Sequence, residues 1–398
     1  MSKLKELIQQ YCPDGVPNKT LGELGKFFGG LTGKSKDDFT DGNAKFITYK
    51  NVYANPALQI DVEDRVKIAD GEKQRTLQYG DVVFTGSSET PDECGISSVV
   101  TVKTEETLYL NSFCFFFRFD DLSIMLPDFA KHLFRSNELR YQIGKTASGV
   151  TRYNVSKKMM EKVSIPVPPL PVQREIVRIL DKFTELIAEL TAELTARKKQ
   201  YEFYRDKLLT FGRCPSSDVV WRTLGEVCNL QSGKSISAYL ISDTQTVENS
   251  IPCYGANGLR GYVSTFNESG DKPIVGRQGA LCGNVCFATG FYYATEHAVV
   301  VTDKGFFNNR FLYHLLVNAD LNQYKTAGAQ PGLSVARLNE VKVPVPTRMV
   351  QDKIANVLDN FDAICSDLKI GLPAEIEARK KQYEFYREKL LAFHEISN

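Results

Sequence analysis

Apolar residues recur in alternating steps of four and three along two long stretches of this chain. The first stretch runs from Ile176 to Phe211, and every position of its seam except Arg197 is apolar or aromatic. The second stretch runs from Ile354 to Phe393 with the same spacing. This pattern predicts two long helices, each with a coiled-coil seam. The seam residues we identify are Ile176, Leu180, Phe183, Ile187, Leu190, Leu194, Tyr201, Tyr204 and Leu208 in the first stretch, and Leu358, Phe361, Leu368, Tyr383, Tyr386 and Leu390 in the second.

The second stretch contains four extra residues, so two steps of four follow each other at Leu368, Leu372 and Ile376. A four-residue insertion is a stutter, which locally unwinds a coiled coil. Gly371 and Pro373 stand at this point, and Pro favours the first turn of a helix. We therefore expect a break or kink near 371–373. We expect the two seams to pack on each other as antiparallel helices, the alternative being that each helix only caps its own domain.

A nearly identical sixteen-residue segment occurs once in each stretch. Ala196–Phe211 reads ARKKQYEFYRDKLLTF, and Ala378–Phe393 reads ARKKQYEFYREKLLAF. The similarity continues upstream, where Val163–Phe183 corresponds to Val341–Phe361. A repeat of this length outside low-complexity sequence indicates a duplicated structural unit. The chain therefore consists of two copies of one half, and we expect its target to be bipartite as well.

The two halves differ almost completely over residues 40–125 and 240–305, where strand-like runs alternate with turn residues. The fold class predicted is α+β, with two α/β domains on a shared helical frame and a pseudo-two-fold internal repeat. The layout predicted is a first domain with a short N-terminal helix over 1–165, a spacer helix over 172–212, a second domain over 213–346 and a C-terminal spacer helix over 350–396. Strands are expected at Ile96–Lys103, Leu108–Phe119, Lys272–Gly276, Asn284–Ala288 and Ala298–Thr302, each set being followed by a short helix, around Asp128–Phe134 and Asn309–Val317.

Composition and charge narrow the possibilities only slightly. The net charge is +1, and 42% of the residues are hydrophobic. Because there is no long apolar run and no apolar signal core in the first residues, we expect a cytoplasmic protein with nine reduced cysteines. The stretches 139–160 and 321–338 contain basic, hydroxyl and amide side chains but no acidic residue. Such stretches suit phosphate contacts, and the alternative is a solvated basic face.

We find no catalytic motif. Gly33-Lys34-Ser35 and its counterpart Gly233-Lys234-Ser235 lack the earlier glycine of a phosphate-binding loop. Cys282 and Cys286 could bind zinc together with Cys253 and His297, but the first half has no counterpart, and buried thiols are the more common case. The repeat-matched His132 and His314 are expected to pack between helices rather than to catalyse. The chain is therefore expected to be a binding protein without metal ligands.

The chain resembles the specificity subunits of type I restriction-modification systems. The resemblance rests on the repeated RKKQYEFYR-x-KLL helix, on QREIVRILDKF, on GLPAEIEARKKQYEFYR, and on the segments GDVVFTGS and IVGRQGA. It implies two target recognition domains, each reading one half of a split double-stranded DNA sequence, on an antiparallel helical spacer. It also implies two methyltransferase subunits and restriction subunits as partners. The S-adenosylmethionine and ATP/Mg sites would lie on those partners, with no cofactor on this chain.

Candidate DNA-binding residues follow from loop position and side-chain chemistry, since Arg suits guanine and Gln suits adenine in the major groove. They are Tyr49, Lys50, Asn51, Ser87, Ser88, Thr90, Lys145, Arg152, Tyr153 and Lys157 in the first half, and Asn257, Arg260, Arg277, Gln278, Lys325 and Gln330 in the second. Two alternatives stay open. One is a two-lobed scaffold that binds proteins, and the other is a specificity subunit that serves a methylation-only or other defence complex.

The first helix contains the tetrapeptide AELT twice in tandem, at 188–191 and 192–195. This looks like the tetrapeptide repeat of one branch of the family. Each unit adds about 6 Å of helix, and B-DNA rises about 3.4 Å per base pair. We expect insertion of one more unit to lengthen the unread spacer between the half-sites by one or two base pairs. Mapping the methylated sites of such a variant tests this, and an unchanged spacer would contradict it.

Overall fold

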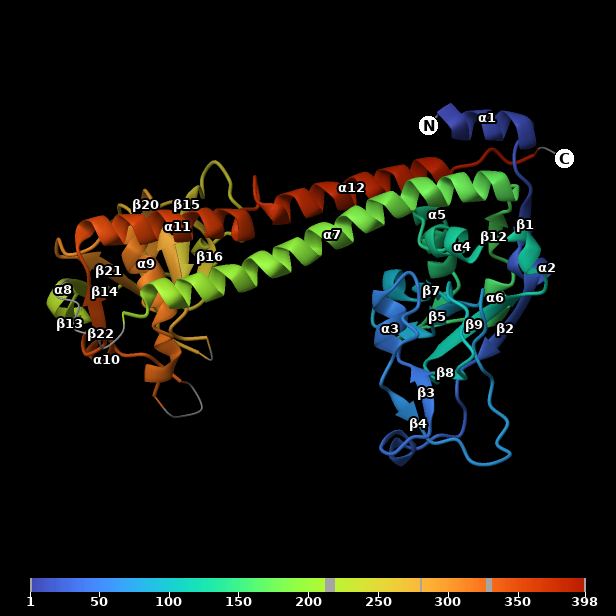
Figure 1. Ribbon diagram of the computed structural model, residues 1–398, viewed down its shortest axis with the longest axis horizontal. Coiled ribbons are helices and arrows are strands. Elements are labelled where there is room, and N and C mark those ends of the chain that lie inside the picture. The colour runs from blue at the N-terminus through green and yellow to red at the C-terminus, as the bar shows by residue number, and fades with distance from the viewer. Residues whose placement is uncertain (1, 212–218, 280, 327–330, 397–398) are drawn as a thin grey trace. The chain divides into compact units, whose positions relative to one another are not determined.

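The computed structural model describes residues 2–211, 219–279, 281–326 and 331–396. These residues form two compact units (Figure 1). The first unit comprises residues 1–189 and 377–398, and the second comprises residues 190–376. Each unit therefore combines one of the predicted domains with parts of both long helical stretches.

The elements of the first unit alternate strands with short helices before the long helix begins. In chain order they are α1 (Ser2–Tyr11), β1 (Asn18–Thr20), α2 (Leu21–Leu24), β2 (Gly25–Gly29), the 3-10 helix η1 (Lys36–Phe39), β3 (Ala44–Ile47), α3 (Tyr49–Ala54), β4 (Arg65–Val66), β5 (Val82–Thr85), β6 (Ser87–Ser88), η2 (Pro91–Glu93), β7 (Ser97–Val99), β8 (Leu108–Leu110), β9 (Cys114–Phe119), η3 (Leu122–Ile124), α4 (Pro127–Leu133), α5 (Asn137–Gly144), β10 (Ala147–Ser148), β11 (Tyr153–Val155), α6 (Lys157–Met160), β12 (Ser164–Pro166) and α7 (Leu170–Leu209).

The second unit repeats this plan, and α12 then returns to the first unit. Its elements are β13 (Val220–Thr223), α8 (Leu224–Val227), β14 (Cys228–Ser232), η4 (Ala238–Leu240), β15 (Ile251–Gly255), β16 (Gly258–Val263), β17 (Glu268–Ser269), β18 (Lys272–Gly276), β19 (Val285–Ala288), β20 (Phe291–Ala294), β21 (Ala298–Asp303), α9 (Asn309–Asn318), η5 (Leu321–Tyr324), α10 (Val335–Asn339), β22 (Lys342–Val345), α11 (Arg348–Ser366) and α12 (Leu372–Leu391).

An antiparallel four-stranded sheet forms the centre of each unit, with the order β2-β9-β5-β7 in the first and β14-β21-β18-β19 in the second. Successive side chains of a strand point to opposite faces. Phe115 and Phe117 accordingly pack in one apolar cluster, while Cys114 and Phe116 pack in another. Both faces of the sheet are thus buried, which explains the apolar run CFFF at the start of β9.

Two sequence-based strand assignments in the first half need correction. The predicted strand Leu108–Phe119 is two strands, β8 and β9, separated by a turn. Asn111 closes that turn, because its carbonyl accepts from the Cys114 amide at 3.0 Å and its side chain accepts from the Phe113 amide at 2.8 Å. The predicted strand Ile96–Lys103 is ordered as a strand only at Ser97–Val99. The strands and helices predicted in the second half are confirmed to within one residue at most ends, as β18, β19, β21 and α9.

The long helices agree with most of the seam prediction, in the burial of their seam residues and in the break of the second stretch. Helix α7 is continuous, and its seam residues are buried or half-buried. The second stretch is broken, as the stutter predicted, but the break lies at 367–371 between α11 and α12. Leu368 lies in this turn with 81% of its surface exposed, so its assignment to the seam was wrong. Gly371 permits the turn, because a Cβ there would come within 2.6 Å of the Ala363 carbonyl oxygen.

In both units α7 runs antiparallel to the returning helix beside it (Figure 1). In the first unit the ring of Phe183 stacks on that of Tyr386, with centroids 5.2 Å apart and planes at 22°. In the second unit Tyr204 stacks on Phe361 at 5.7 Å and also at 22°. The two copies of the repeated segment are therefore exchanged. Copy 378–393 packs in the first unit, and copy 196–211 packs in the second.

A buried histidine joins the domain helix to both long helices in each unit. In the first unit His132 Nε2 lies 2.8 Å from Asp181 Oδ1, and its Nδ1 lies 2.9 Å from the Tyr383 hydroxyl. Because a carboxylate can only accept, Nε2 donates to Asp181 and Nδ1 accepts from Tyr383. We call these three residues the first His–Asp–Tyr cluster. The tyrosine belongs to the repeated segment that lies downstream of the other domain.

The second His–Asp–Tyr cluster consists of His314, Asp359 and Tyr201. His314 Nε2 lies 2.7 Å from Asp359 Oδ1, and the Tyr201 hydroxyl lies 3.3 Å from His314 Nδ1. Both histidines are buried, with 1% or less of their surface exposed. The expectation that these histidines pack between helices is confirmed, and the structure adds that they do so by the same two contacts in both units.

Candidate nucleic-acid interface

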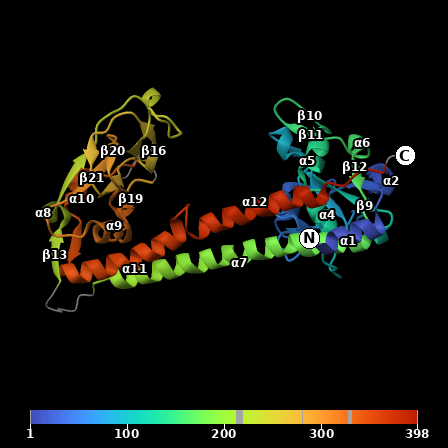
Figure 2. The ribbon, with the colours of Figure 1, turned by 90° about the horizontal axis from the view of Figure 1, so that it is seen from above.

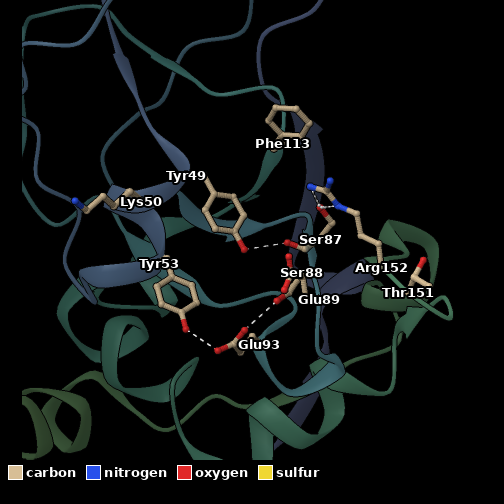
Figure 3. Close-up of a pocket in the computed structure, with 10 residues that line it drawn as sticks. All are labelled: Tyr49, Lys50, Tyr53, Ser87, Ser88, Glu89, Glu93, Phe113, Thr151 and Arg152. Atoms are coloured by element: carbon tan, nitrogen blue, oxygen red, sulfur yellow. Dashed lines mark hydrogen bonds between the residues drawn. The ribbon is translucent and has the colours of Figure 1, made fainter. Parts of the chain in front are cut away.

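A cavity of about 560 Å³ opens on the first unit where α3, β6 and the β10–β11 hairpin meet (Figure 3). Its lining includes five of the candidate DNA-binding residues. In the view of Figure 2 the β10–β11 hairpin stands clear of α7 and α12, so the helix pair does not cover it. The residues that line the cavity are Tyr49, Lys50, Tyr53, Ser87, Ser88, Glu89, Glu93, Phe113, Thr151 and Arg152.

Helix α3 supplies one wall of this cavity. Thr48 begins the helix, because its side chain accepts a hydrogen bond from the Asn51 amide. Tyr49 and Tyr53 are four residues apart and therefore share one face of the helix. Their rings are 6.3 Å apart and nearly parallel, at 17°. The Tyr49 hydroxyl donates to the Ser87 carbonyl at 2.9 Å, which fixes this wall against β6.

Arg152 enters the cavity from the turn between β10 and β11. Gly149 is required in that turn, because its φ is +151° and a Cβ would overlap the Arg152 carbonyl oxygen. The Arg152 Nε and Nη2 atoms donate to Ser87 Oγ at 3.1 and 3.0 Å. Its guanidinium lies 5.8 Å from the centre of the exposed Phe113 ring. The side chain is therefore held at two points while its Nη1 end has no hydrogen bond to any described residue of this cavity.

Glu93 faces Ser88, the neighbour of Ser87 on β6. Its carboxylate accepts from the Tyr53 hydroxyl at 2.9 Å and from Ser88 Oγ at 3.1 Å. These hydrogen bonds, that from Tyr53 above all, lower the pKa of Glu93. The same contact raises the pKa of Tyr53. Glu93 is therefore a fixed carboxylate at neutral pH, and the cavity presents a cation beside Ser87 and an anion beside Ser88.

The other candidates of the first unit lie outside this cavity. Asn51 is buried and bonds to the Gln59 backbone with both ends of its amide, so its assignment to DNA binding is wrong. Thr90 is exposed on the loop that follows β6. Lys145 is exposed and lies over the ring of Tyr141, and Lys157 lies over the ring of Phe115. Tyr153 is part of β11, where it pairs with Ser88.

The second unit has a cavity of about 470 Å³ in which Arg277 and Gln278 meet Glu296 and His297. Arg277 is held as Arg152 is, since its Nη1 donates to Ser232 Oγ at 2.8 Å. Both units therefore place an arginine, fixed by a serine hydroxyl, in a cavity that also contains a glutamate. The remaining linings differ, and in the second unit they include Thr326, Gly332, Leu333 and Ser334.

The remaining candidates of the second unit are dispersed. Asn257 lines a separate cavity that also contains Asp320 and Asp362, and its side-chain oxygen accepts from Asn284 at 3.2 Å. Arg260 is exposed on β16, and Lys325 donates to Asn322 Oδ1 at 2.8 Å. Gln330 lies outside the described residues.

Sequence reasoning missed part of both cavities. Tyr53 could have been found, because it lies one helical turn after Tyr49 in a segment that begins with a capping residue. Phe113 was hidden inside a strand prediction that ran through its turn. Glu93 and Glu296 carry no local signal, since acidic residues were not expected at a surface that binds DNA.

Neither a metal site nor a membrane span is found among the described residues. No group of three or more His, Cys, Asp or Glu side chains there could hold a metal ion. Cys253 and Cys282 are buried thiols, and Cys286 lies 3.8 Å from the Ile274 carbonyl oxygen. No described helix is both long and apolar enough to cross a bilayer.

Comparison with known families gives a match on both halves. The model of the type I restriction modification DNA specificity domain matches residues 13–197 and again residues 216–378. The chain belongs to this family. It is 47% identical over 207 residues to the specificity subunit of the type I restriction enzyme EcoprrI of Escherichia coli, covering 51% of each chain. It is 34% identical over 268 residues to the EcoR124I/EcoR124II specificity subunit of the same organism, covering 60% of this chain and 65% of that one.

These matches span about half to two thirds of the length of the curated relatives. This chain is similar in fold to a solved S subunit of a type I restriction-modification system from M. genitalium. The TM-score is 0.59 at 17% identity, and the match covers 94% of this chain and 96% of that one. The fold class predicted from the sequence is thereby confirmed.

Proposed function

We propose that this chain is the DNA-specificity subunit of a type I restriction-modification complex and that each unit reads one half of a split DNA sequence. The observation that carries the proposal is that the specificity domain matches the chain twice and that the central sheets of the two units have the same strand order. The units share their frame but line their cavities with different side chains. A common frame with two different linings suits two unlike half-sites.

The partners are proposed to be two methyltransferase subunits and restriction subunits. The chain itself is proposed to have no catalytic role, and S-adenosylmethionine and ATP/Mg are proposed to bind to the partners. In support, the side chains of the two cavities offer donors and acceptors for base edges, among them the guanidinium of Arg152 and that of Arg277. The relatives are named as subunits of restriction enzymes, which agrees with activity that resides in a complex.

The test is to express the full chain with a methyltransferase partner and to map methylated sites on plasmid DNA. We expect methylation at one split sequence with an unread spacer of fixed length. Methylation without sequence preference, or a complex that forms but does not bind DNA, would contradict the proposal. The second of these results is the one expected of a two-lobed scaffold that binds only proteins.

Two exposed phenylalanines mark a surface for the partner subunits. Phe203 and Phe385 occupy the same position of the repeated segment, and each is 60% exposed. Each ring lies 5.7 Å from a lysine Nζ, of Lys207 or Lys389. Large aromatic side chains are frequent hot spots of protein interfaces. Equivalent sites on the two copies suit two copies of one partner.

We expect Phe203→Ala together with Phe385→Ala to weaken methyltransferase binding at least tenfold, with either single variant retaining one bound partner. The exposed Glu202→Ala on the same helix serves as a control. Analytical ultracentrifugation of the reconstituted complex gives the stoichiometry and the affinity. Unchanged binding by the double variant would show that the partners dock elsewhere.

A further inference from the structure

We propose that the cavity of the first unit reads one G·C base pair, with Arg152 bound to the guanine and Glu93 bound to the amino group of the cytosine. This inference rests on the proposed function and specifies which bases one of its two sites selects. The argument uses the positions of these two side chains on either side of Ser87 and Ser88 (Figure 3).

The contacts of Arg152 with Ser87 leave a pair of its donors unused. A guanidinium has five N–H groups, and Ser87 Oγ takes one from Nε and one from Nη2. The N–H groups at the Nη1 and Nη2 end are left as a parallel pair. Such a pair matches the O6 and N7 acceptors of guanine in the major groove, which is the commonest specific contact of arginine with DNA. Phe113 lies beside the guanidinium plane and limits its movement.

Glu93 supplies the complementary acceptor. Each of its oxygens accepts one hydrogen bond, from Tyr53 or from Ser88. A carboxylate has about four acceptor positions, so each oxygen can accept another hydrogen bond. The cytosine N4 amino group is the only donor that a G·C pair shows in the major groove, and carboxylates accept from it. The lowered pKa of Glu93 agrees with a charged acceptor.

The same two side chains select against other ligands. In an A·T pair placed the same way, the adenine amino group would face the donors of Arg152 and the thymine O4 would face the carboxylate of Glu93. Both contacts would be repulsive. The lining balances two cations, Lys50 and Arg152, with two carboxylates, Glu89 and Glu93, so it has no excess of positive charge to hold a phosphate. This mixture of donors and acceptors suits a base edge better than the DNA backbone.

The experiment uses the full chain with its methyltransferase partner and a library of duplexes that covers every base of the mapped sequence. In the wild type, replacing one G·C pair of one half-site by A·T should lower methylation at least tenfold. In Arg152→Ala this ratio should fall below about threefold, while the other half-site keeps its preference. Arg152→Lys keeps the charge but loses the parallel donors, so it should relax the same position. Glu93→Gln should relax it as well.

Two controls separate specific reading from loss of folding or of affinity. Arg65 is exposed on β4 of the same unit and does not line the cavity, so Arg65→Ala should leave the preference unchanged. A duplex with 7-deazaguanine at the assigned position lacks N7 and should weaken binding by the wild type but not by Arg152→Ala. Circular dichroism and thermal unfolding confirm that each variant is folded.

The possible failures are distinguishable. If Arg152→Ala and Arg152→Lys select the same half-site as the wild type and only bind more weakly, the assignment of this cavity to a G·C pair is wrong while the proposed function stands. If the wild type shows no sequence preference, the proposed function itself is wrong. A wild-type half-site without an essential G·C pair also overturns the assignment.

Discussion

Replacing Gln173 by Leu is expected to lower the free energy of unfolding of the first unit by about 3–5 kcal/mol. Gln173 is fully buried at the start of α7. Its Oε1 accepts from the Leu126 amide at 2.9 Å, and its Nε2 donates to the Ile124 and Pro168 carbonyls at 2.7 Å each. Leucine keeps the volume but leaves three buried or partly buried backbone groups without this partner, and a buried group left unpaired costs about 1–3 kcal/mol.

Hydrogen exchange measures this effect locally, because the Leu126 amide loses its acceptor and should exchange faster together with its neighbours. Urea unfolding gives the global change. Gln382→Ala is the matched control, since Gln382 is exposed on α12 and its loss should cost less than about 0.5 kcal/mol. A Gln173→Leu variant as stable as this control would show that the amide does not hold the helix start to the loop before α4.

The equivalent Gln351 makes the same three contacts in the second unit. Its Oε1 accepts from the Asn308 amide at 2.7 Å, and its Nε2 donates to the Phe306 and Pro346 carbonyls. Gln351→Leu is therefore expected to destabilise the second unit by a similar amount. Loss of stability in only one of the two units would show that the two glutamines are not equivalent.

The stability of the protein is expected to fall as the pH drops below about 6.5, the pKa of an unfolded histidine. Burial lowers the pKa of His132, against the hydrogen bond to Asp181, which raises it. Burial lowers the pKa of His314 in the same way, against Asp359. A lowered pKa means that the unfolded chain binds more protons, so stability is complete above pH 6.5 and declines until the folded pKa is reached. Each histidine contributes a slope of up to about 1.4 kcal/mol per pH unit.

The charged groups beside the two histidines determine the pH interval in which the titration of the histidines can be separated from that of the aspartates. Lys131 and Asp128 also face His132, and Arg310 and Asp362 face His314. The pKa of Asp181 is lowered, because hydrogen bonds from His132 and Lys131 outweigh its burial, and Asp359 behaves likewise with Arg310 and His314. Their stabilising contribution is lost only below about pH 4. The interval from pH 6.5 to 5 therefore reports mainly on the histidines.

Chemical denaturation at several pH values measures this dependence. We expect the double variant His132→Gln and His314→Gln to be less stable than the wild type at pH 8 but to lose most of its pH dependence between 6.5 and 5. A variant with the wild-type slope, or a wild type with no slope in this interval, would contradict the assignment to the two histidines.

The sequence was sufficient to predict the duplicated frame, because the frame is encoded by local periodicity. Leu180 and Leu358 are fully buried at the seam positions assigned to them. The stutter also predicted a break in the second stretch. The assignment of Leu368 to the seam was wrong. A stutter can be accommodated either by a shift of the seam or by a turn that exposes one seam residue, and periodicity does not distinguish these two outcomes.

The exchange of the repeated segments follows from the antiparallel packing that the seams predicted, because each copy then lies beside the start of the other stretch. The contacts that attach the copies to the domains, from Tyr383 to His132 and from Tyr201 to His314, could not be predicted, because periodicity does not show which side chains meet across the helices. The cavity of the first unit was found only in part for a related reason. Arg152, Tyr53 and Phe113 come together through the pairing of β11 with β6, which is non-local, and through a turn at Asn111 that the apolar pattern on both sides of it conceals.

The exchanged repeats have a consequence for how such a protein can evolve. Each domain is attached through a histidine, an aspartate, a glutamine and the tyrosine of the other half, and these attachment points are the same in both units. Recombination between the halves, or with a related gene, would thus replace the divergent insert of one unit while its attachment to the helices stays intact. On the proposed function, exchange of a whole insert changes one DNA half-site and leaves the shared frame unchanged.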